Sequence, residues 1–233
     1  MKKILITGGD GGLAKELSLQ GINDFKFVKP TRLDMDITCI NDIDMFINKH
    51  KPDIVIHSAA LTKPMSLHNT NISKSIDVNI IGTANVVKVC EKYGIKLVYI
   101  STDYVYPFDS TDVKEDSPLL PINNYGWSKL GGECSVKMYD NSLIIRLSFS
   151  EKPFPHNAAY TNIIRNHLYI DEASSLILSV INKVGVINIG SEEKHTLYEF
   201  ANKTNNDVKP NKYVGDTLPK IMTLNVDKLW KMK

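Results

Sequence analysis

Cysteine is scarce in this sequence, and its pattern excludes two classes of small stabilised protein. Cys39, Cys90 and Cys134 are odd in number and widely spaced, and no Cys-x-x-Cys pair occurs. A disulfide framework or a structural zinc site needs paired or closely spaced cysteines. We therefore expect no disulfide scaffold and no metal site. A reducing compartment, most simply the cytoplasm, is the expected location.

Long apolar runs and dense clusters of one charge are also missing. The apolar run at residues 4–6 ends at Thr7, which is too short for a signal-peptide core or a membrane-spanning helix. Lys and Arg number 28 against 26 Asp and Glu, a net charge of +2. We therefore expect neither a membrane segment nor a nucleic-acid partner.

The sequence does contain a regular alternation of strand and helix patterns. At 233 residues it can bury a large core. Short runs that predict strands recur at residues 3–7, 25–28, 52–57, 96–101 and 142–147, and the first is apolar and rich in β-branched residues, as is typical of a buried parallel strand. They predict an α/β fold, a Rossmann-type doubly wound parallel sheet over residues 1–150. Residues 151–233 are expected to form a small lobe intertwined with that domain.

Three helices are predicted in more detail. Residues 73–93 indicate one long helix with an apolar stripe made by Ile76, Ile80, Ala84 and Val87. Thr38 or Asn41 is a candidate cap for a helix that ends near residue 49. Thr196 is expected to begin a short capped helix in the C-terminal part of the chain.

A glycine-rich turn follows the first strand. Gly8, Gly9, Gly11 and Gly12 precede an amphipathic run, which gives the strand–turn–helix order of a dinucleotide fingerprint. Glycines let the backbone approach a pyrophosphate, and the helix N-terminus offers N–H donors. A plain glycine-rich turn without a ligand is the other interpretation. The position directly after the first strand favours dinucleotide binding, with Ala14 where helix and strand pack.

The second strand, residues 25–28, does not end in the acidic residue that a strict NAD site uses to hold the ribose hydroxyls. Lys29 and Arg32 follow it instead. They are either solvated loop cations or groups that accept a ribose 2′-phosphate. We favour NADPH as the cofactor, with NADH as the alternative. Asp36 is placed to meet the adenine edge.

Tyr125 and Lys129 share one face of a predicted helix because they are four residues apart. A nearby ammonium favours a phenolate. We therefore expect Lys129 to lower the pKa of Tyr125 and to make it a proton donor near neutral pH. Alone, this pair is a weak signal. Ser101 and Thr102 strengthen it, because they follow a central strand and so lie at the crevice where such sheets bind ligands.

Two further polar residues have two interpretations each. His57 is a lone histidine on an apolar strand, and we interpret it as a core residue rather than a catalytic one. Asn79 lies on the long helix at 73–93. It either organises a polar site through its amide or makes a simple bond between helices.

Three segments together resemble a known family. Residues 7–14, 101–106 and 125–133 resemble the extended short-chain dehydrogenases, and among these dTDP-4-dehydrorhamnose reductase and related nucleotide-sugar 4-ketoreductases. The resemblance runs from the N-terminus to about Phe149. The cofactor set that it implies is Gly8, Gly11, Gly12 and Leu13 at the pyrophosphate, Asp36 and Ile37 at the adenine, and Ser58, Ala59, Ala60, Asn79, Tyr125 and Lys129 along the rest.

The resemblance also implies a reaction. Thr102, Tyr125 and Lys129 would form the catalytic trio. The residues that face the sugar would be Thr102, Asp103, Tyr104 and Phe149, the last standing where these reductases often have tryptophan. The implied activity is NAD(P)H-dependent reduction of a UDP- or dTDP-linked 4-keto-6-deoxyhexose. Tyr125 would give a proton to the alkoxide, and Thr102 would donate a second hydrogen bond to the same oxygen.

Some relatives also epimerise the carbon beside the ketone, which needs a second acid–base pair. Asp103 with His156 is one candidate pair. We favour the other interpretation, in which Asp103 is a structural loop residue and His156 lies on the surface.

Two other functions stay open. One is a redox-neutral epimerase or dehydratase that keeps NAD bound, and the other is a non-catalytic dinucleotide-binding regulatory subunit. The segment between Phe149 and Tyr169, which usually shapes the sugar-nucleotide pocket in this family, is short in this sequence. Relatives often dimerise through the helix at 73–93 and the Tyr125 helix, and a homodimer is a further expectation.

Overall fold

Six parallel strands form the central sheet of the computed structural model, which describes residues 1–216 and 218–232. Their order is β10-β5-β4-β3-β1-β2. Their bounds are β1 Lys2–Thr7, β2 Phe25–Val28, β3 Ile54–His57, β4 Lys96–Ile100, β5 Ser142–Leu147 and β10 Gly185–Ile189. The strand order reverses between β1 and β3, the point at which doubly wound sheets bind ligands. The predicted Rossmann-type sheet is confirmed.

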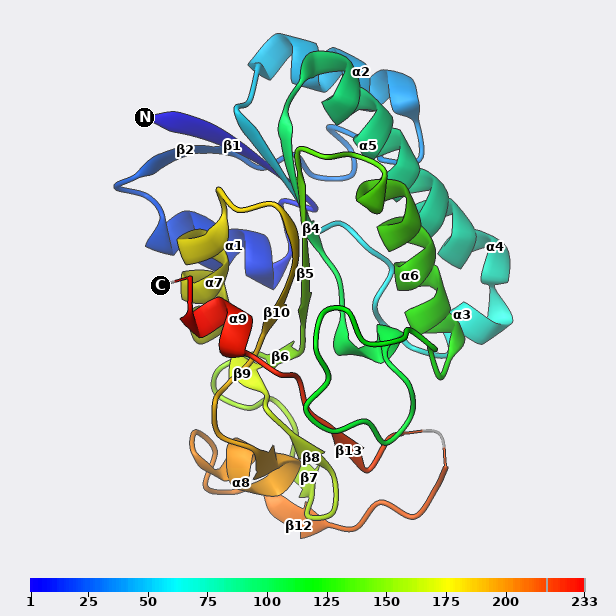
Figure 1. Cartoon of the computed structure of the whole chain (residues 1–233), viewed down its shortest axis with the longest axis vertical. Helices are drawn as coiled ribbons and strands as arrows, with labels where there is room; N and C mark the ends of the chain where they lie inside the picture. The colour runs from blue at the N-terminus through cyan, green and yellow to red at the C-terminus, as the bar shows by residue number, and fades with distance from the viewer. Residues whose placement is uncertain (217, 233) are drawn as a thin grey trace.

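Helices cover both faces of this sheet (Figure 1). They are α1 Gly12–Gln20 and α7 Ile170–Val180 on one face, and α2 Ile40–His50, α5 Gly82–Tyr93 and α6 Asn124–Lys137 on the other. Side chains alternate between the faces with the period of a strand. Ile4 and Ile6 therefore join one buried cluster and Leu5 the other. Covering on both sides explains why the strand sequences are almost continuously apolar.

The chain after β5 returns to the sheet and also builds a small lobe. It contributes β10 and α7 to the sheet layers, and α9 (Asp227–Trp230) packs beside β10. The lobe lies below the sheet in Figure 1, where the chain leaves β5. Its elements are β6 Phe149–Ser150, β7 Ala158–Tyr160, β8 Ile164–Arg165, β9 Leu168–Tyr169, β11 His195–Thr196, α8 Leu197–Asn202, β12 Lys209–Asn211 and β13 Ile221–Met222.

The long helix predicted at 73–93 is continuous but changes its winding. It consists of α4 Ile72–Ile76, a π-helical turn at Asp77–Ile81 and α5. A π turn bonds residue i to i+5, so it shifts the stripe by one residue. Ile76 is consequently 40% exposed, whereas Val87 is 8% exposed. The π turn therefore interrupts the predicted apolar stripe of Ile76, Ile80, Ala84 and Val87, which is exposed at Ile76 and buried at Val87.

The predicted helix caps have mixed outcomes. Thr196 begins α8 in a reciprocal pair with Glu199, whose carboxylate accepts from the Thr196 N–H at 2.8 Å, so this prediction is confirmed. The expected cap of α2 by Thr38 or Asn41 is wrong. Cys39 precedes α2 without a side-chain cap, because the Thr38 hydroxyl donates to Asp36 instead. Among the described residues, no helix has the length and apolarity required to cross a membrane.

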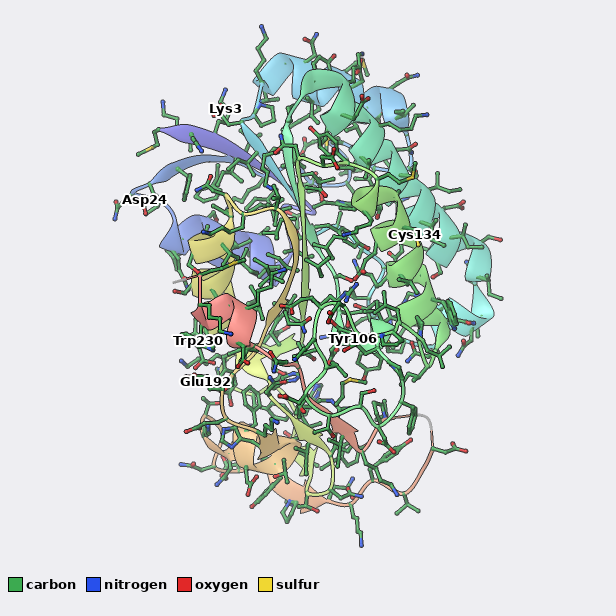
Figure 2. The ribbon with its side chains drawn as sticks, viewed as in Figure 1. Lys3, Asp24, Tyr106, Cys134, Glu192 and Trp230 are labelled. Carbon is green, nitrogen blue, oxygen red and sulfur yellow. The ribbon has the colours of Figure 1, made fainter. Side chains whose placement is uncertain are left out.

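A buried ion pair fastens α6 to the sheet. The guanidinium of Arg146 on β5 donates to both carboxylate oxygens of Glu133 on α6, the closest at 2.8 Å, and both side chains are under 5% exposed. The hydroxyl of Ser101 also donates to Glu133. Arg146 donates further to Tyr106, which lies in the middle of the molecule in Figure 2. This network therefore joins α6 to the ends of β4 and β5.

We expect Glu133→Gln to lower the free energy of unfolding by about 3–5 kcal/mol, because it leaves the Arg146 charge buried without a counter-charge. Urea unfolding followed by circular dichroism measures this loss. Glu193→Gln is the matched control, since Glu193 pairs with Lys203 and His195 on the surface. It should change stability by less than about 1 kcal/mol. Equal effects of the two substitutions would contradict the expectation.

Candidate active site

The glycine turn after β1 is shaped so that side chains do not fit in it. Gly8 has a φ of +71°, and a methyl group on it would approach the Cα of Ala59 to 3.0 Å. A methyl group on Gly9 would collide with the carbonyl of Lys29. The Gly11 N–H closes the turn on the Gly8 carbonyl at 2.9 Å. The turn is therefore a cradle of bare backbone at the switch point between β1 and β3.

The N-terminus of α1 opens onto this cradle. Gly11 precedes the helix without a side-chain cap, and the first turn holds no acidic residue. The first N–H groups of a helix have no partner within the helix, and with the helix dipole they attract anions. The residues present thus fit a pyrophosphate held by Gly8, Gly11, Gly12 and Leu13.

Small residues face the cradle from the end of β3. The Ser58 hydroxyl donates to the Thr7 carbonyl at 2.7 Å, and the Ala59 N–H donates to the Thr7 hydroxyl at 3.0 Å. Ser58, Ala59 and Ala60 are half-buried. These bonds hold the ends of β1 and β3 together. The predicted cofactor-lining residues therefore lie at the same crevice as the glycine turn.

His57 is a core residue, as interpreted from the sequence. It is fully buried, with its ring nitrogens 2.8 Å from the Thr7 hydroxyl and 3.0 Å from the Thr83 hydroxyl. Burial lowers its pKa to about 3. The ring is therefore neutral and serves as a bridge between β1 and α5.

The predicted adenine end contains a hollow of about 510 Å³. Arg32, Thr38, Lys74 and Val78 are among its lining residues. The Asp36 carboxylate beside it accepts from the Thr38 N–H at 2.9 Å and pairs with Arg32 at 3.1 Å. These bonds and the Arg32 charge outweigh partial burial and hold the pKa of Asp36 below its usual value.

Ile37 and Lys29 lie at different places along the predicted cofactor crevice. Ile37 is 6% exposed and packs against Gly82 at the start of α5. The backbone of Lys29 touches Gly9, and its ammonium donates to the Ser18 hydroxyl on α1 at 2.8 Å. Lys29 therefore lies beside the glycine turn, whereas Arg32 stands at the hollow.

Asn79 connects the crevice to α6 from within the π turn. Its amide oxygen accepts from the Leu61 N–H at 2.7 Å, and its amide nitrogen donates to the Leu61 carbonyl at 3.0 Å and to the Ser128 hydroxyl at 2.8 Å. It is 1% exposed. Of the two interpretations from the sequence, the geometry favours an organising role, because these bonds fix the loop after β3 against α6.

Thr102 and Tyr125 lie close together where β4 ends and α6 begins, and Lys129 reaches the end of β4 from the next turn of α6. The Asn123 side chain caps α6 by accepting from the Gly126 N–H at 2.8 Å. The phenol of Tyr125 faces the hydroxyl of Thr102, which opposes the rise that burial causes in the pKa of the phenol. The Lys129 ammonium donates to the Ile100 carbonyl at 2.8 Å and lies 4.2 Å from the Tyr99 ring centre. One face of α6 thus meets the end of β4 at the crevice edge of the sheet.

Burial controls the protonation of this site. It raises the pKa of Tyr125, with only partial compensation from the Thr102 hydroxyl. It lowers the pKa of Lys129 to about 7, although Glu133 opposes the shift. The expectation that Lys129 lowers the pKa of Tyr125 is therefore wrong for the free chain. Lys129 directs its ammonium to the Ile100 carbonyl, and desolvation of the phenol dominates.

The residues predicted to face the sugar are largely covered in the free chain. Asp103 is 2% exposed and accepts from the Thr102 hydroxyl at 3.1 Å. The Tyr104 ring stands edge-on to Tyr125 with centres 6.0 Å apart. Phe149 is half-buried on β6. His156 is exposed and packs on Phe154 at 5.4 Å, as expected for a surface histidine.

Two residues at this site carry no signal in the sequence. His68 on α3 (Leu67–Thr70) is 1% exposed, and its ring centre lies 5.1 Å from that of Tyr125. Arg165 on β8 is 5% exposed and bonds the Tyr104 hydroxyl. Neither belongs to a motif, and each reaches the site only through the tertiary fold.

Comparison with known proteins identifies the family of the chain. A family model described as the RmlD substrate binding domain matches residues 1–163. The dTDP-4-keto-6-deoxy-D-glucose reductase of Streptomyces niveus is 34% identical over 152 residues, which are 62% of this chain and 51% of that protein. The chain thus spans about half the length of that relative.

Two dTDP-4-dehydrorhamnose reductases extend the similarity over more of the chain. The enzyme of Aggregatibacter actinomycetemcomitans is 24% identical over 220 residues, 86% of this chain and 73% of that protein. The crystal structure of the Bacillus anthracis enzyme in complex with NADP matches with a TM-score of 0.88 at 26% identity. It covers 99% of this chain, and this chain covers 91% of it.

The low pKa of Lys129 predicts a pH-dependent stability. The unfolded chain keeps this proton up to about pH 10.5, whereas the folded chain loses it near pH 7. Stability should therefore rise with pH across that window, by on the order of 4 kcal/mol, as the cost of the buried charge disappears. Lys129→Met should remove this rise in urea unfolding, and Lys137→Met, on the exposed side of α6, should keep it. A wild-type curve parallel to that of Lys129→Met would contradict the shift.

Proposed function

Because the chain belongs to the RmlD substrate-binding domain family, within the extended short-chain dehydrogenases, we propose that it reduces a nucleotide-linked 4-keto-6-deoxyhexose with NAD(P)H. One observation carries this proposal. Thr102 and Tyr125 lie together at the crevice edge of the sheet that also holds the glycine cradle, and Lys129, one turn along α6, reaches the end of the same strand β4. A subunit that only binds a dinucleotide has no use for a buried phenol, hydroxyl and ammonium in one place.

Each residue of the trio has a defined task in this reaction. When bound, a reduced nicotinamide supplies the hydride that the ketone carbon accepts. Burial keeps Tyr125 protonated, so it holds the proton that the developing alkoxide needs. Thr102 offers a second hydrogen bond to the same oxygen. The side chain of Lys129 is bonded to the Ile100 carbonyl. It is a cation below about pH 7 and a neutral amine above that pH.

The cofactor in this proposal is NADPH rather than NADH. Lys29 lies beside the glycine turn and Arg32 lines the hollow at the adenine end, so two cations flank the expected position of the adenosine ribose. A ribose 2′-phosphate pairs well with such cations. The Bacillus anthracis reductase of similar structure was crystallised with NADP.

Tyr125→Phe should lower kcat by about 10²–10⁴-fold, because it removes the general acid while keeping the ring. NADPH oxidation with a small panel of UDP- and dTDP-4-keto-6-deoxyhexoses measures this loss. NADPH binding, followed by fluorescence titration, should stay close to the wild-type value. Tyr93→Phe, at the far end of α5, is the matched control. Turnover of Tyr125→Phe at the wild-type rate would refute the proposed role.

Lys29→Ala should raise KM for NADPH about tenfold and leave KM for NADH nearly unchanged, since one charge-assisted contact is worth about 1.4 kcal/mol. Steady-state assays with both cofactors measure the two values. Lys26→Ala is a control of the same charge on the exposed side of β2. If Lys29→Ala weakens NADH as much as NADPH, the assignment of Lys29 to a 2′-phosphate is wrong.

A further inference from the structure

The hydroxyl of Thr102 has one hydrogen, and two acceptors need it. The proposed reaction requires it on the substrate oxygen. In the free chain the Thr102 hydroxyl lies 3.1 Å from an Asp103 carboxyl oxygen, to which it donates while Asp103 is ionised, and the Thr102 oxygen accepts from the Tyr104 N–H at 3.3 Å. A hydroxyl donates only one hydrogen bond at a time. An ionised Asp103 cannot donate, so it competes with the substrate for this hydrogen.

The surroundings of Asp103 disfavour its ionised form. The side chain is 2% exposed, and no cation within the described ranges comes close enough to form an ion pair with it. Arg165 is the facing cation, but its donors go to the carbonyls of Ile164 at 2.8 Å and Pro219 at 2.9 Å and to the Tyr104 hydroxyl.

Three ionisable groups act on Asp103 or lie next to it, namely Arg165 on β8, Tyr104 on its own loop and Tyr125 on α6. Burial outweighs the opposing charge of Arg165 and raises the pKa of Asp103. A buried carboxyl without a bonded cation holds a proton more easily than an exposed one.

We propose that Asp103 works in its protonated form as the proton store of the site, connected to Tyr125 through the hydroxyl of Thr102. Its O–H donates to the Thr102 oxygen, which frees the Thr102 hydrogen for the substrate. This inference rests on the proposed reductase function and adds a role for Asp103 different from the predicted sugar contact.

The proton transfers balance. The ketone carbon gains the hydride, and its oxygen takes the proton of the Tyr125 O–H. Once the product hydroxyl has formed, the Thr102 hydroxyl turns its hydrogen to the Tyr125 oxygen and passes that proton on, and the Asp103 proton moves to the Thr102 oxygen. Tyr125 and Thr102 end as they began and Asp103 ends as a carboxylate. One proton from solvent restores it as product leaves, which is the proton that reduction of a ketone consumes.

Asp103→Asn separates this role from a structural one. The amide still donates a hydrogen bond to Thr102, so the first turnover should run close to the wild-type rate. The amide has no proton to pass on, so later turnovers should slow at least about tenfold. Rapid-mixing measurements should therefore show a burst of one NADPH oxidised per site, followed by a slow phase. A small added acid such as imidazolium should accelerate that slow phase, because it delivers protons but does not hasten product release.

Three results with Asp103→Asn would overturn the proposal. The first is a first turnover as slow as the later ones, without a burst. The others are a steady-state rate equal to that of the wild type, or a slow phase that imidazolium does not accelerate. Asp109→Asn is the comparison variant, since it loosens the same loop at its bonds to the N–H groups of Lys220 and Ile221 without touching the relay, and it should give no burst. Wild-type reduction of the sugar panel is measured first. If it is absent, the proposed function fails, not the relay.

A second measurement needs neither a variant nor a substrate. In the wild-type chain labelled with ¹³C at the aspartate carboxyls, carbon NMR should show one carboxyl that remains protonated at neutral pH and titrates far above the others. If every aspartate titrates in the ordinary range, Asp103 stores no proton and the inference is wrong.

Discussion

The attachment of α6 to the end of β4 is the constraint on which the site depends. Two buried groups on α6 make it: the Lys129 ammonium donates to the Ile100 carbonyl at 2.8 Å, and the Glu133 carboxylate accepts from Ser101. Arg146 compensates the carboxylate, so the charge can stay buried. Thr102 directly follows Ser101 and Tyr125 lies one turn before Lys129. The same bonds that hold the helix therefore also set the distance between the phenol and the hydroxyl.

This attachment has an electrostatic consequence. Groups that are close enough to react together are also removed from water, and desolvation then decides their protonation. The Tyr125 phenol keeps its proton, and the Lys129 ammonium titrates near neutral pH. The buried His57 ring stays neutral. The identity of the residues alone does not predict these protonation states. In the free chain the Tyr125 phenol is therefore protonated because it is buried, and the Lys129 ammonium does not lower its pKa.

The local sequence pattern predicted most of the strands and helices but little of the burial and the tertiary contacts around the site. Phe25–Val28 and Ser142–Leu147 form strands over the predicted residues, because β-branched apolar runs between turns leave few alternatives. The spacing of Tyr125 and Lys129 likewise fixed their common face. The π turn at Asp77–Ile81 could not be predicted, since its extra residue looks ordinary in the sequence. The shifted pKa values and the arrival of Arg165 depend on burial and on contacts between distant segments, which no local pattern records.

The C-terminal segment explains how so short a lobe can support the loop that carries Thr102 and Asp103. The Asp109 carboxylate accepts the backbone N–H groups of Lys220 and Ile221, and the backbones of Val113 and Asn225 are bonded at 2.8 Å. Arg165 adds the Pro219 carbonyl and the Tyr104 hydroxyl. The loop after β4 is thus fixed on one side by the start of α6 and on the other by residues more than 100 positions later. A site held from both sides does not need a long insertion to order it, so the short segment after Phe149 is compatible with a pre-organised reaction centre.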